Sequence, residues 1–171
     1  MSDDDVDPDV DGDGGAVDDP EAAPATRGLI LLVNGPNLDL LGQRQPEVYG
    51  TTTLDDHVET VRRTAGEFGL AVEHVQSNHE GDIVEAIHEA RSRCAGIVIN
   101  PGAFTHYAWA VHDALAAFEG PVIEVHLSNP QRREGWRHTS VVTPVATGTI
   151  SGLGGLGYVL AVKALARLLD G

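Results

Sequence analysis

The chain has 171 residues, of which 42% are hydrophobic, so it is long enough for one compact domain with an apolar core and too short for two. Its formal net charge is −15, and residues 1 to 26 hold ten acidic residues and no base, which leaves 16 acidic against 11 basic residues elsewhere. With Lys163 as the single lysine, the chain lacks the clustered positive charge that binds nucleic acid or an anionic membrane surface.

Residues 1–26 are predicted to form a disordered acidic tail, and residues 27–171 a single domain. The tail consists mainly of Asp, Gly, Pro and Ala, which bury too little apolar surface to offset the entropy of ordering. It begins with acids rather than with the basic start of a signal peptide, and no apolar run in the chain approaches the ~20 residues that span a bilayer. A single cysteine, Cys94, excludes an intrachain disulfide and a zinc site of several thiolates. These features predict a cytoplasmic protein.

From residue 28 onward, short apolar runs alternate with amphipathic stretches. The run Leu29 to Val33 is too short for a buried helix and apolar throughout, which is typical of a central parallel strand. Thr53 then caps a helix that Gly69 ends. The remaining predicted elements are a strand over residues 71–75, a helix with Ile83, Ile87 and Ala90 on one face, a strand over 96–99, a helix over 106–118, strands over 121–125 and 148–150, and a helix over 155–169.

This alternation predicts an α/β fold, a flavodoxin-like doubly wound parallel sheet of five strands in the order 2-1-3-4-5. Ligands of such folds bind beyond the carboxyl ends of the strands, near the switch point between strands one and three. Three loops at that edge carry polar side chains: Asn34 to Leu38, Asn100 to His106, and His126 to Asn129 followed by Arg132, Arg133 and Arg137. We therefore expect a site there.

The first of these connections, residues 34–52, is about nineteen residues long where two to six are usual, so it is either disordered or functional, and a lid over the site fits. It carries Arg44 and Tyr49. A tyrosine is a weak base at neutral pH, but a nearby guanidinium favours the phenolate.

Glu124 and His126 are two residues apart on a predicted strand and therefore point to the same face. A carboxylate inside a parallel strand is costly unless it is paired. We expect Glu124 to orient His126 or raise its pKa, which would make His126 a proton donor at the strand tip; a purely structural pair is the alternative.

Six ordered blocks of the sequence together resemble the type II 3-dehydroquinate dehydratase family over residues 29 to 168. The blocks are Asn34-Gly35-Pro36-Asn37-Leu38, Arg44 with Glu47-Val48-Tyr49-Gly50, Gln76 to Gly81, Asn100 to Ala103 with Thr105-His106, Glu124 to Asn129, and Arg133-Glu134. The resemblance implies conversion of 3-dehydroquinate to 3-dehydroshikimate and water, by anti elimination through an enolate, in the shikimate pathway or in quinate catabolism. It also implies no cofactor, no metal and no Schiff base.

Residue roles follow from the same resemblance. Tyr49 would take the C2 proton, Arg44 would keep it ionised, and Asn37 would hold a water at the enolate oxygen. His126 would protonate the departing hydroxyl with Glu124 behind it. The residues implied in substrate binding are Asn100, His106, the amides of Leu127 and Ser128, and Arg137.

The family also implies a homododecamer built as a tetramer of trimers. The last predicted helix is apolar on more than one face, which favours association. Asp113 lies seven residues after His106 on one predicted helix, about 10 Å along its axis, too far for both to hold one small ring. Asp113 is therefore expected to reach a neighbouring subunit's site.

Two other protein classes share the predicted fold. A flavodoxin would bind FMN through a Ser/Thr- and Gly-rich loop after the first strand, where this chain has Asn34-Gly35-Pro36-Asn37. A phosphoacceptor signalling domain would need an aspartate at the end of strand three, where this chain has Asn100.

Overall fold

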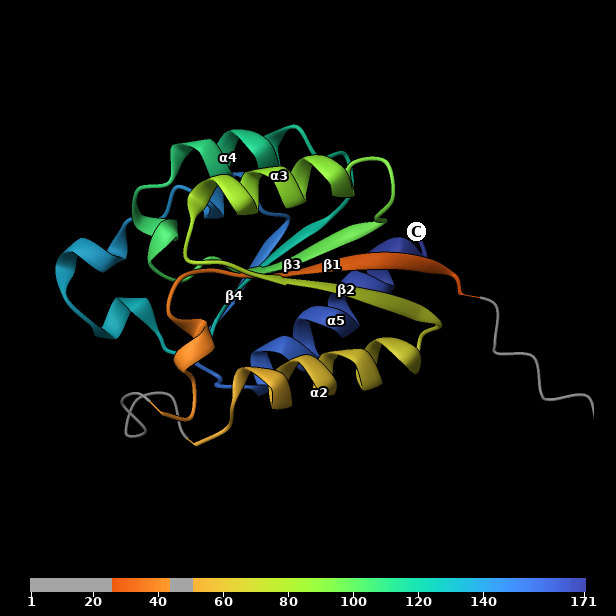
Figure 1. Cartoon of the computed structure of the whole chain (residues 1–171), viewed down its shortest axis with the longest axis horizontal. Coiled ribbons are helices and arrows are strands. Elements are labelled where there is room, and N and C mark those ends of the chain that lie inside the picture. The colour runs from red at the N-terminus through yellow and green to blue at the C-terminus, as the bar shows by residue number, and fades with distance from the viewer. Residues whose placement is uncertain (1–25, 44–50) are drawn as a thin grey trace, which may run out of the picture.

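The computed structural model describes residues 26–43 and 51–171, and its centre is a five-stranded parallel sheet in the order β2-β1-β3-β4-β5 (Figure 1). The predicted fold and strand order are thus confirmed. The strands are β1 (Gly28–Asn34), β2 (Leu70–Gln76), β3 (Gly96–Asn100), β4 (Val122–His126) and β5 (Gly148–Ser151).

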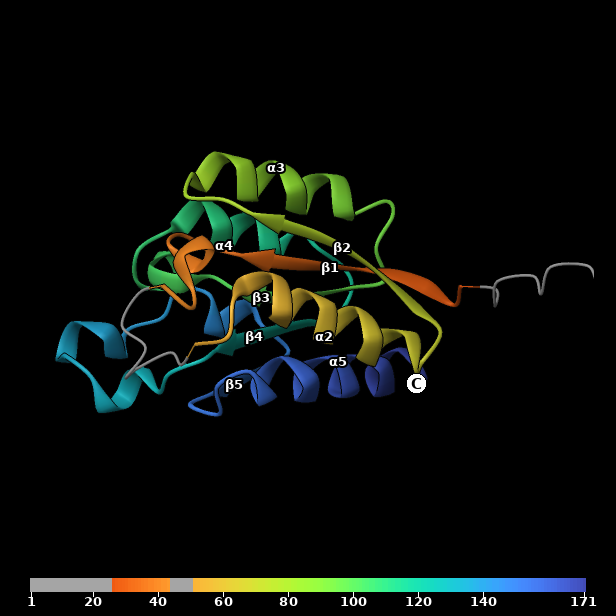
Figure 2. The same cartoon turned by 60° about the horizontal axis from the view of Figure 1, so that its bottom comes forward.

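Helices cover both faces of the sheet. α3 (Glu80–Ala90) and α4 (Trp109–Ala116) lie on one face, while α2 (Leu54–Gly66) and α5 (Leu156–Leu169) lie on the other (Figures 1 and 2). Side chains of β1 alternate between two buried clusters, with Leu31 packed toward α3 and α4 and Leu32 toward α2 and α5. Because both faces of the strand are buried, its sequence is apolar throughout rather than alternating.

The start of α2 follows the sequence prediction. Thr53 accepts a hydrogen bond from the backbone N–H of Asp56, whose carboxylate in turn accepts from the Thr53 N–H, so the two form a capping box. The last turn ends at Gly66, and Gly69 adopts a left-handed φ of 69° before β2 begins.

The helix predicted over residues 106–118 is wrong at its start. A 3₁₀ turn, Gly102–His106, comes first, and α4 begins only at Trp109. The carbonyl of Thr105 accepts the backbone N–H of Val141 at 2.7 Å, so a tertiary contact takes the acceptor that a continuous helix would use. His106 and Asp113 therefore do not share a helix, and the spacing argument that joined them fails.

Between β4 and β5 the chain forms three short 3₁₀ turns that the sequence did not predict. They are Pro130–Arg132, Gly135–His138 and Thr143–Val145. A further 3₁₀ turn, Leu38–Leu40, follows β1. Among the described residues, no helix is both long and apolar enough to cross a membrane.

Candidate active site

A cavity of about 280 Å³, here called the site cavity, opens at the carboxyl ends of β1, β3 and β4. The sequence pointed to this edge because the strands are parallel and their ends meet there. Seven of the predicted site residues line it: Asn37, Asn100, His106, His126, Leu127, Ser128 and Arg137.

The other predicted site residues are elsewhere. Arg44 and Tyr49 lie outside the described residues, as do the other residues of the segment 44–50 of the long connection that carries them. Glu124 is fully buried beneath the cavity. Asp113 is exposed on α4 and is not part of the cavity wall, so its expected reach to a neighbouring subunit stays a prediction.

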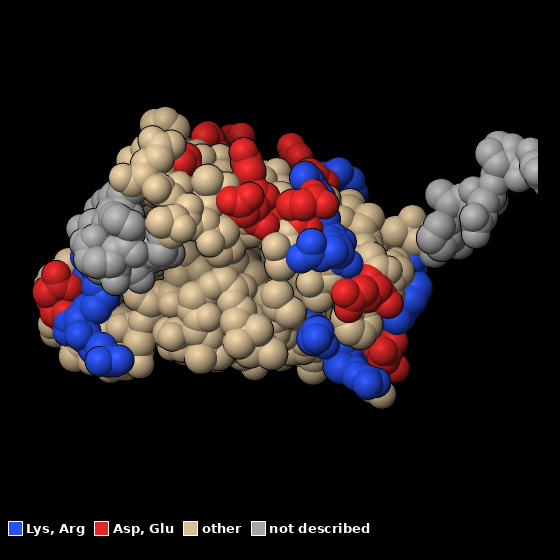
Figure 3. Space-filling model, turned by 90° about the horizontal axis from the view of Figure 1, so that it is seen from below, with Lys and Arg blue, Asp and Glu red and all other residues tan. Residues whose placement is uncertain are grey.

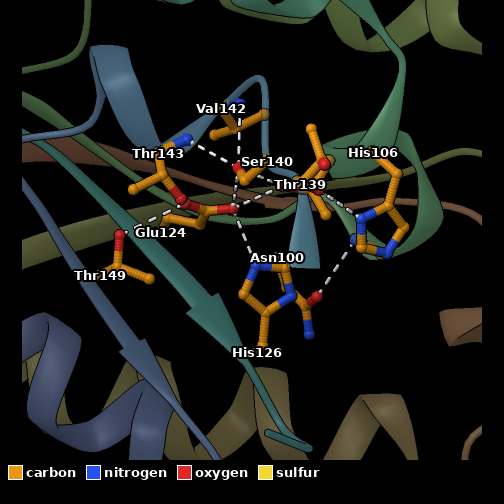
Figure 4. Close-up of polar contacts among 11 residues, drawn as sticks. Asn100, His106, Glu124, His126, Thr139, Ser140, Val142, Thr143 and Thr149 are labelled. Carbon is orange, nitrogen blue, oxygen red and sulfur yellow. Dashed lines mark hydrogen bonds and ion pairs between the residues drawn. The ribbon is translucent and has the colours of Figure 1, made fainter. Parts of the chain in front are cut away.

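Glu124 and His126 form a hydrogen-bonded pair at the end of β4, with 2.8 Å between Glu124 Oε1 and His126 Nε2 (Figure 4). The carboxylate is 0% exposed, and the His126 side chain is 11% exposed. Four hydroxyl groups surround the same carboxylate, and each donates to it: those of Thr105, Ser140, Thr143 and Thr149. All the oxygen lone pairs of this buried acid thus have donors nearby.

Burial acts to raise the pKa of the Glu124 carboxyl, but the hydrogen bonds from His126, Thr143 and Thr105 and the charge of His126 together hold that pKa below its ordinary value. Glu124 is therefore a carboxylate at neutral pH and only accepts hydrogen bonds. Because its partner must donate, His126 Nε2 carries a hydrogen, which leaves Nδ1 as the ring nitrogen that can exchange a proton with a ligand.

His106, which also lines the site cavity, is oriented in a similar way. Its Nδ1 lies 2.7 Å from the carbonyl oxygen of Thr139, which can only accept, so Nδ1 carries the hydrogen and Nε2 is an acceptor. The ring meets Trp136 edge to face, with centroids 5.2 Å apart. Hence His106 can accept a hydrogen bond from a ligand hydroxyl.

Arg137 supplies positive charge to the same wall. Its guanidinium lies 4.1 Å from the centre of the Trp136 ring, and its Nε donates to Glu134 Oε2 at 2.7 Å. Basic side chains gather at the end of the molecule where the turns Pro130–Arg132 and Gly135–His138 lie (Figure 3). A guanidinium in this position can bind an organic carboxylate.

Polar, oriented groups at the ends of three parallel strands define the site. Comparison with known proteins shows to which family the chain belongs. A model of the family described as "Dehydroquinase class II" matches residues 28–166. The chain belongs to this family.

Individual relatives agree with the assignment. The 3-dehydroquinate dehydratase of Halalkalibacterium halodurans is 54% identical over 136 residues, which cover 80% of this chain and 94% of that protein. The 3-dehydroquinate dehydratase 2 of Pseudomonas putida is 55% identical over 142 residues, which cover 83% and 95%. The crystal structure of a type II dehydroquinase from Propionibacterium acnes has a TM-score of 0.80 at 46% identity and covers 83% of this chain and 98% of that one. As a class II dehydroquinase the chain is a hydro-lyase, which sets aside the flavodoxin and phosphoacceptor alternatives.

Some supporting residues of this dehydroquinase were missed by sequence reasoning. Two of the hydroxyls around Glu124, those of Ser140 and Thr143, come from a connection without helical or strand periodicity, so no pattern placed them beside β4; a third, that of Thr149, lies on β5 opposite Glu124. The signal was their composition: residues 139–151 carry six Ser or Thr.

Asn78 is a second missed residue. Its Oδ1 accepts the backbone N–H of Asn37 at 2.7 Å, and Gln76 Nε2 donates to the carbonyl of Gly35 at 3.3 Å. Asn37 itself has a left-handed backbone, φ 64°, which asparagine tolerates better than most residues. The block Gln76 to Gly81, to which the sequence assigned no role, therefore holds the loop that carries Asn37.

Close packing of two loops explains a glycine of the same segment. A Cβ on Gly35 would lie 2.2 Å from the carbonyl oxygen of Pro101, and the Gly35 N–H donates to the carbonyl of Asn100 at 2.8 Å. Only glycine allows this approach of the loops after β1 and β3.

Within residues 26–43 and 51–171, no group of three or more His, Cys, Asp and Glu side chains is arranged to hold a metal ion.

Proposed function

We propose that the chain converts 3-dehydroquinate to 3-dehydroshikimate and water by anti elimination through an enolate. The observation that carries this proposal is the Glu124–His126 pair beside the site cavity of a class II dehydroquinase. Its relatives with the name 3-dehydroquinate dehydratase support the choice of substrate.

The reaction needs a base and an acid on opposite faces of the substrate ring. Tyr49, kept ionised by Arg44, takes the C2 proton, and the electron pair of the C–H bond moves to the carbonyl oxygen to give an enolate. These two residues lie outside the described part of the chain, and their roles rest on the family resemblance. Asn37 holds a water molecule at the enolate oxygen.

His126 completes the reaction as the general acid. When the enolate collapses, the C1–O bond breaks and the hydroxyl takes a proton from His126 Nδ1, so it leaves as water. Glu124 stabilises the doubly protonated imidazolium before the transfer and keeps Nε2 protonated after it. The hydroxyls around Glu124 donate hydrogen bonds to its carboxylate and so stabilise its ionised form throughout the reaction.

The remaining predicted residues bind the substrate. Asn100 and His106 bind ring hydroxyls, while the amides of Leu127 and Ser128 together with Arg137 bind the carboxylate. Asp113 acts in the site of a neighbouring subunit.

That last role requires an oligomer, for which we propose the homododecamer, a tetramer of trimers. Leu153, Leu156, Leu160 and Leu168 are exposed on or next to α5, and a broad uncharged area covers this side of the molecule (Figure 3). Such a surface favours association.

We further propose that residues 1–26 are a dispensable acidic tail, that residues 27–171 are the catalytic domain, and that the enzyme acts in the cytoplasm in the shikimate pathway.

The test is a direct assay of the purified full chain with 3-dehydroquinate. Ultraviolet absorbance of the conjugated enone product should rise with time, and borohydride added with substrate should not inactivate the enzyme, because no imine forms. No absorbance change at any substrate concentration would refute the proposed function, and inactivation by borohydride would refute the enolate route without an imine.

A further inference from the structure

A buried chain of hydrogen bonds links the site cavity to the opposite side of β1. Asn100 Nδ2 donates to the hydroxyl of Tyr158 at 3.0 Å, and that hydroxyl donates to Asn34 Oδ1. Asn34 Nδ2 then lies 3.1 Å from His74 Nε2. Tyr158 belongs to α5, is 1% exposed and does not line the site cavity.

The fold explains why one hydroxyl reaches two strand ends. Asn34 and Asn100 are the last residues of β1 and β3 and are register partners in the parallel pairing. Each shares a face with the residue two positions earlier, Leu32 or Val98, and both of those pack in the core cluster of α2 and α5. The first turns of α5 therefore place the Tyr158 phenol between the two amides.

In this series of hydrogen bonds each group donates to the next in the same direction, from the Gly102 N–H to His74. At one end the backbone N–H of Gly102, which can only donate, lies 3.3 Å from Asn100 Oδ1. At the other end His74 Nε2 accepts from the Asn34 amide, which fixes Oδ1 of Asn34 toward Tyr158. If the Asn100 amide were flipped, its Oδ1 would point at Tyr158 and its NH₂ at the Gly102 N–H, where two donors would oppose each other.

We propose that Tyr158 is a positioning residue that fixes the Asn100 amide for substrate binding. The inference rests on the proposed role of Asn100 in that binding. Tyr158 does not line the site cavity; together with the Gly102 N–H it holds the Asn100 amide in one of its two orientations.

The variant Tyr158→Phe isolates the hydroxyl. The ring of Tyr158 packs 5.5 Å from that of His57 and is surrounded by the core, so phenylalanine keeps its contacts. The amides of Asn34 and Asn100 each lose one hydrogen-bond partner, which leaves the Gly102 N–H at Asn100 and His74 at Asn34 as their remaining partners in this network. Thr64→Val is the matched control: it also removes a buried hydroxyl, which donates to the Thr60 carbonyl on α2, away from the site.

Steady-state kinetics of the full chain with 3-dehydroquinate gives the first test. For Tyr158→Phe we expect KM to rise about 3- to 10-fold, the effect of one hydrogen bond, with kcat within about twofold of wild type. In an Asn100→Ala background the same change should leave KM unaltered, and Thr64→Val should match wild type. An unchanged KM in Tyr158→Phe, or an equal rise in both backgrounds, would overturn the inference.

A crystal structure of Tyr158→Phe gives a readout that does not depend on turnover. We expect the Asn100 amide to be rotated or bonded to a new water, and an amide in its original place without a new partner would overturn the inference. A wild-type chain without dehydratase activity would instead refute the proposed function. If Tyr158→Phe does not fold, His74→Phe serves in its place, because it removes the hydrogen-bond partner of Asn34 at the far end of the network. KM should then rise about twofold, and only when Asn100 is present. No rise in KM would overturn the inference.

Discussion

The backbone N–H of Asn37 donates to Oδ1 of Asn78 at 2.7 Å, so the loop after β2 holds the loop after β1 in place. Asn37 is the residue to which we assign the water at the enolate oxygen. Two strands that are neighbours in the sheet thus share the positioning of one site residue.

Removal of that contact should impair activity. Asn78→Ala is expected to lower kcat/KM about 3- to 10-fold, because the left-handed backbone of Asn37 loses its external acceptor. Asn78→Asp keeps an acceptor oxygen and should retain most of the activity. Steady-state assays of the two variants side by side check this, and equal losses would contradict it.

Glu124→Gln should damage both stability and turnover. A neutral amide of the same size places an NH₂ donor next to hydroxyls that in the wild type donate to the carboxylate, so donors face each other. The amide also carries no charge to stabilise a protonated His126. We expect kcat to fall about 100-fold or more and the midpoint of thermal unfolding to drop. Thr149→Val, which removes a long bond of 3.3 Å to the same carboxylate, should change kcat about threefold or less. A Glu124→Gln enzyme with wild-type kcat would contradict the assigned role.

Stability should fall in two stages on acidification. Burial lowers the pKa of His57, and burial together with the charge of Arg62 lowers that of His74, so the folded state favours neutral imidazoles. Their contribution is full above the ordinary pKa of about 6.5 and is lost as the pH falls below it. The lowered pKa of Glu124 adds a second loss below the ordinary carboxyl value of about 4.5, in the same direction. Denaturant unfolding from pH 8 to pH 3 measures both stages.

The first stage can be tested at one residue. His57 Nε2 is buried without a hydrogen-bond partner among the described residues. His57→Leu conserves the volume and removes this atom, so it should stabilise the protein by about 1 kcal/mol or more and flatten the pH dependence between pH 6.5 and pH 5. An unchanged slope in that interval would contradict the assignment.

Gly35→Ala should prevent normal folding or lower the unfolding midpoint sharply, since the new methyl group would meet the Pro101 carbonyl at 2.2 Å. Gly66→Ala is the control. It lies in α2 with nothing within 4 Å of the added carbon, and it should stabilise by about 0.5–1 kcal/mol. Thermal unfolding of both variants decides whether loop packing at Gly35 is as tight as described.

The sheet was predictable because its signals are local. Runs such as Leu29 to Val33 are buried on both faces, and the two-residue spacing of Glu124 and His126 places them on one side of β4. The features that the sequence did not predict depend on contacts between segments far apart in the chain. The Thr105 carbonyl accepts the backbone N–H of Val141, so α4 begins only at Trp109, and two of the hydroxyls around Glu124, those of Ser140 and Thr143, come from a connection without periodicity. Asn78 acts through a meeting of two loops that no spacing in the sequence encodes.

The most direct test of the central claim, that His126 is the acid of a stepwise elimination, follows two reactions of His126→Ala in deuterated water. Loss of water from 3-dehydroquinate should fall about 100-fold or more, while exchange of the C2 proton with solvent should persist, because enolate formation precedes departure of the hydroxyl. Dehydration at the wild-type rate, or loss of both reactions to the same extent, would contradict the account.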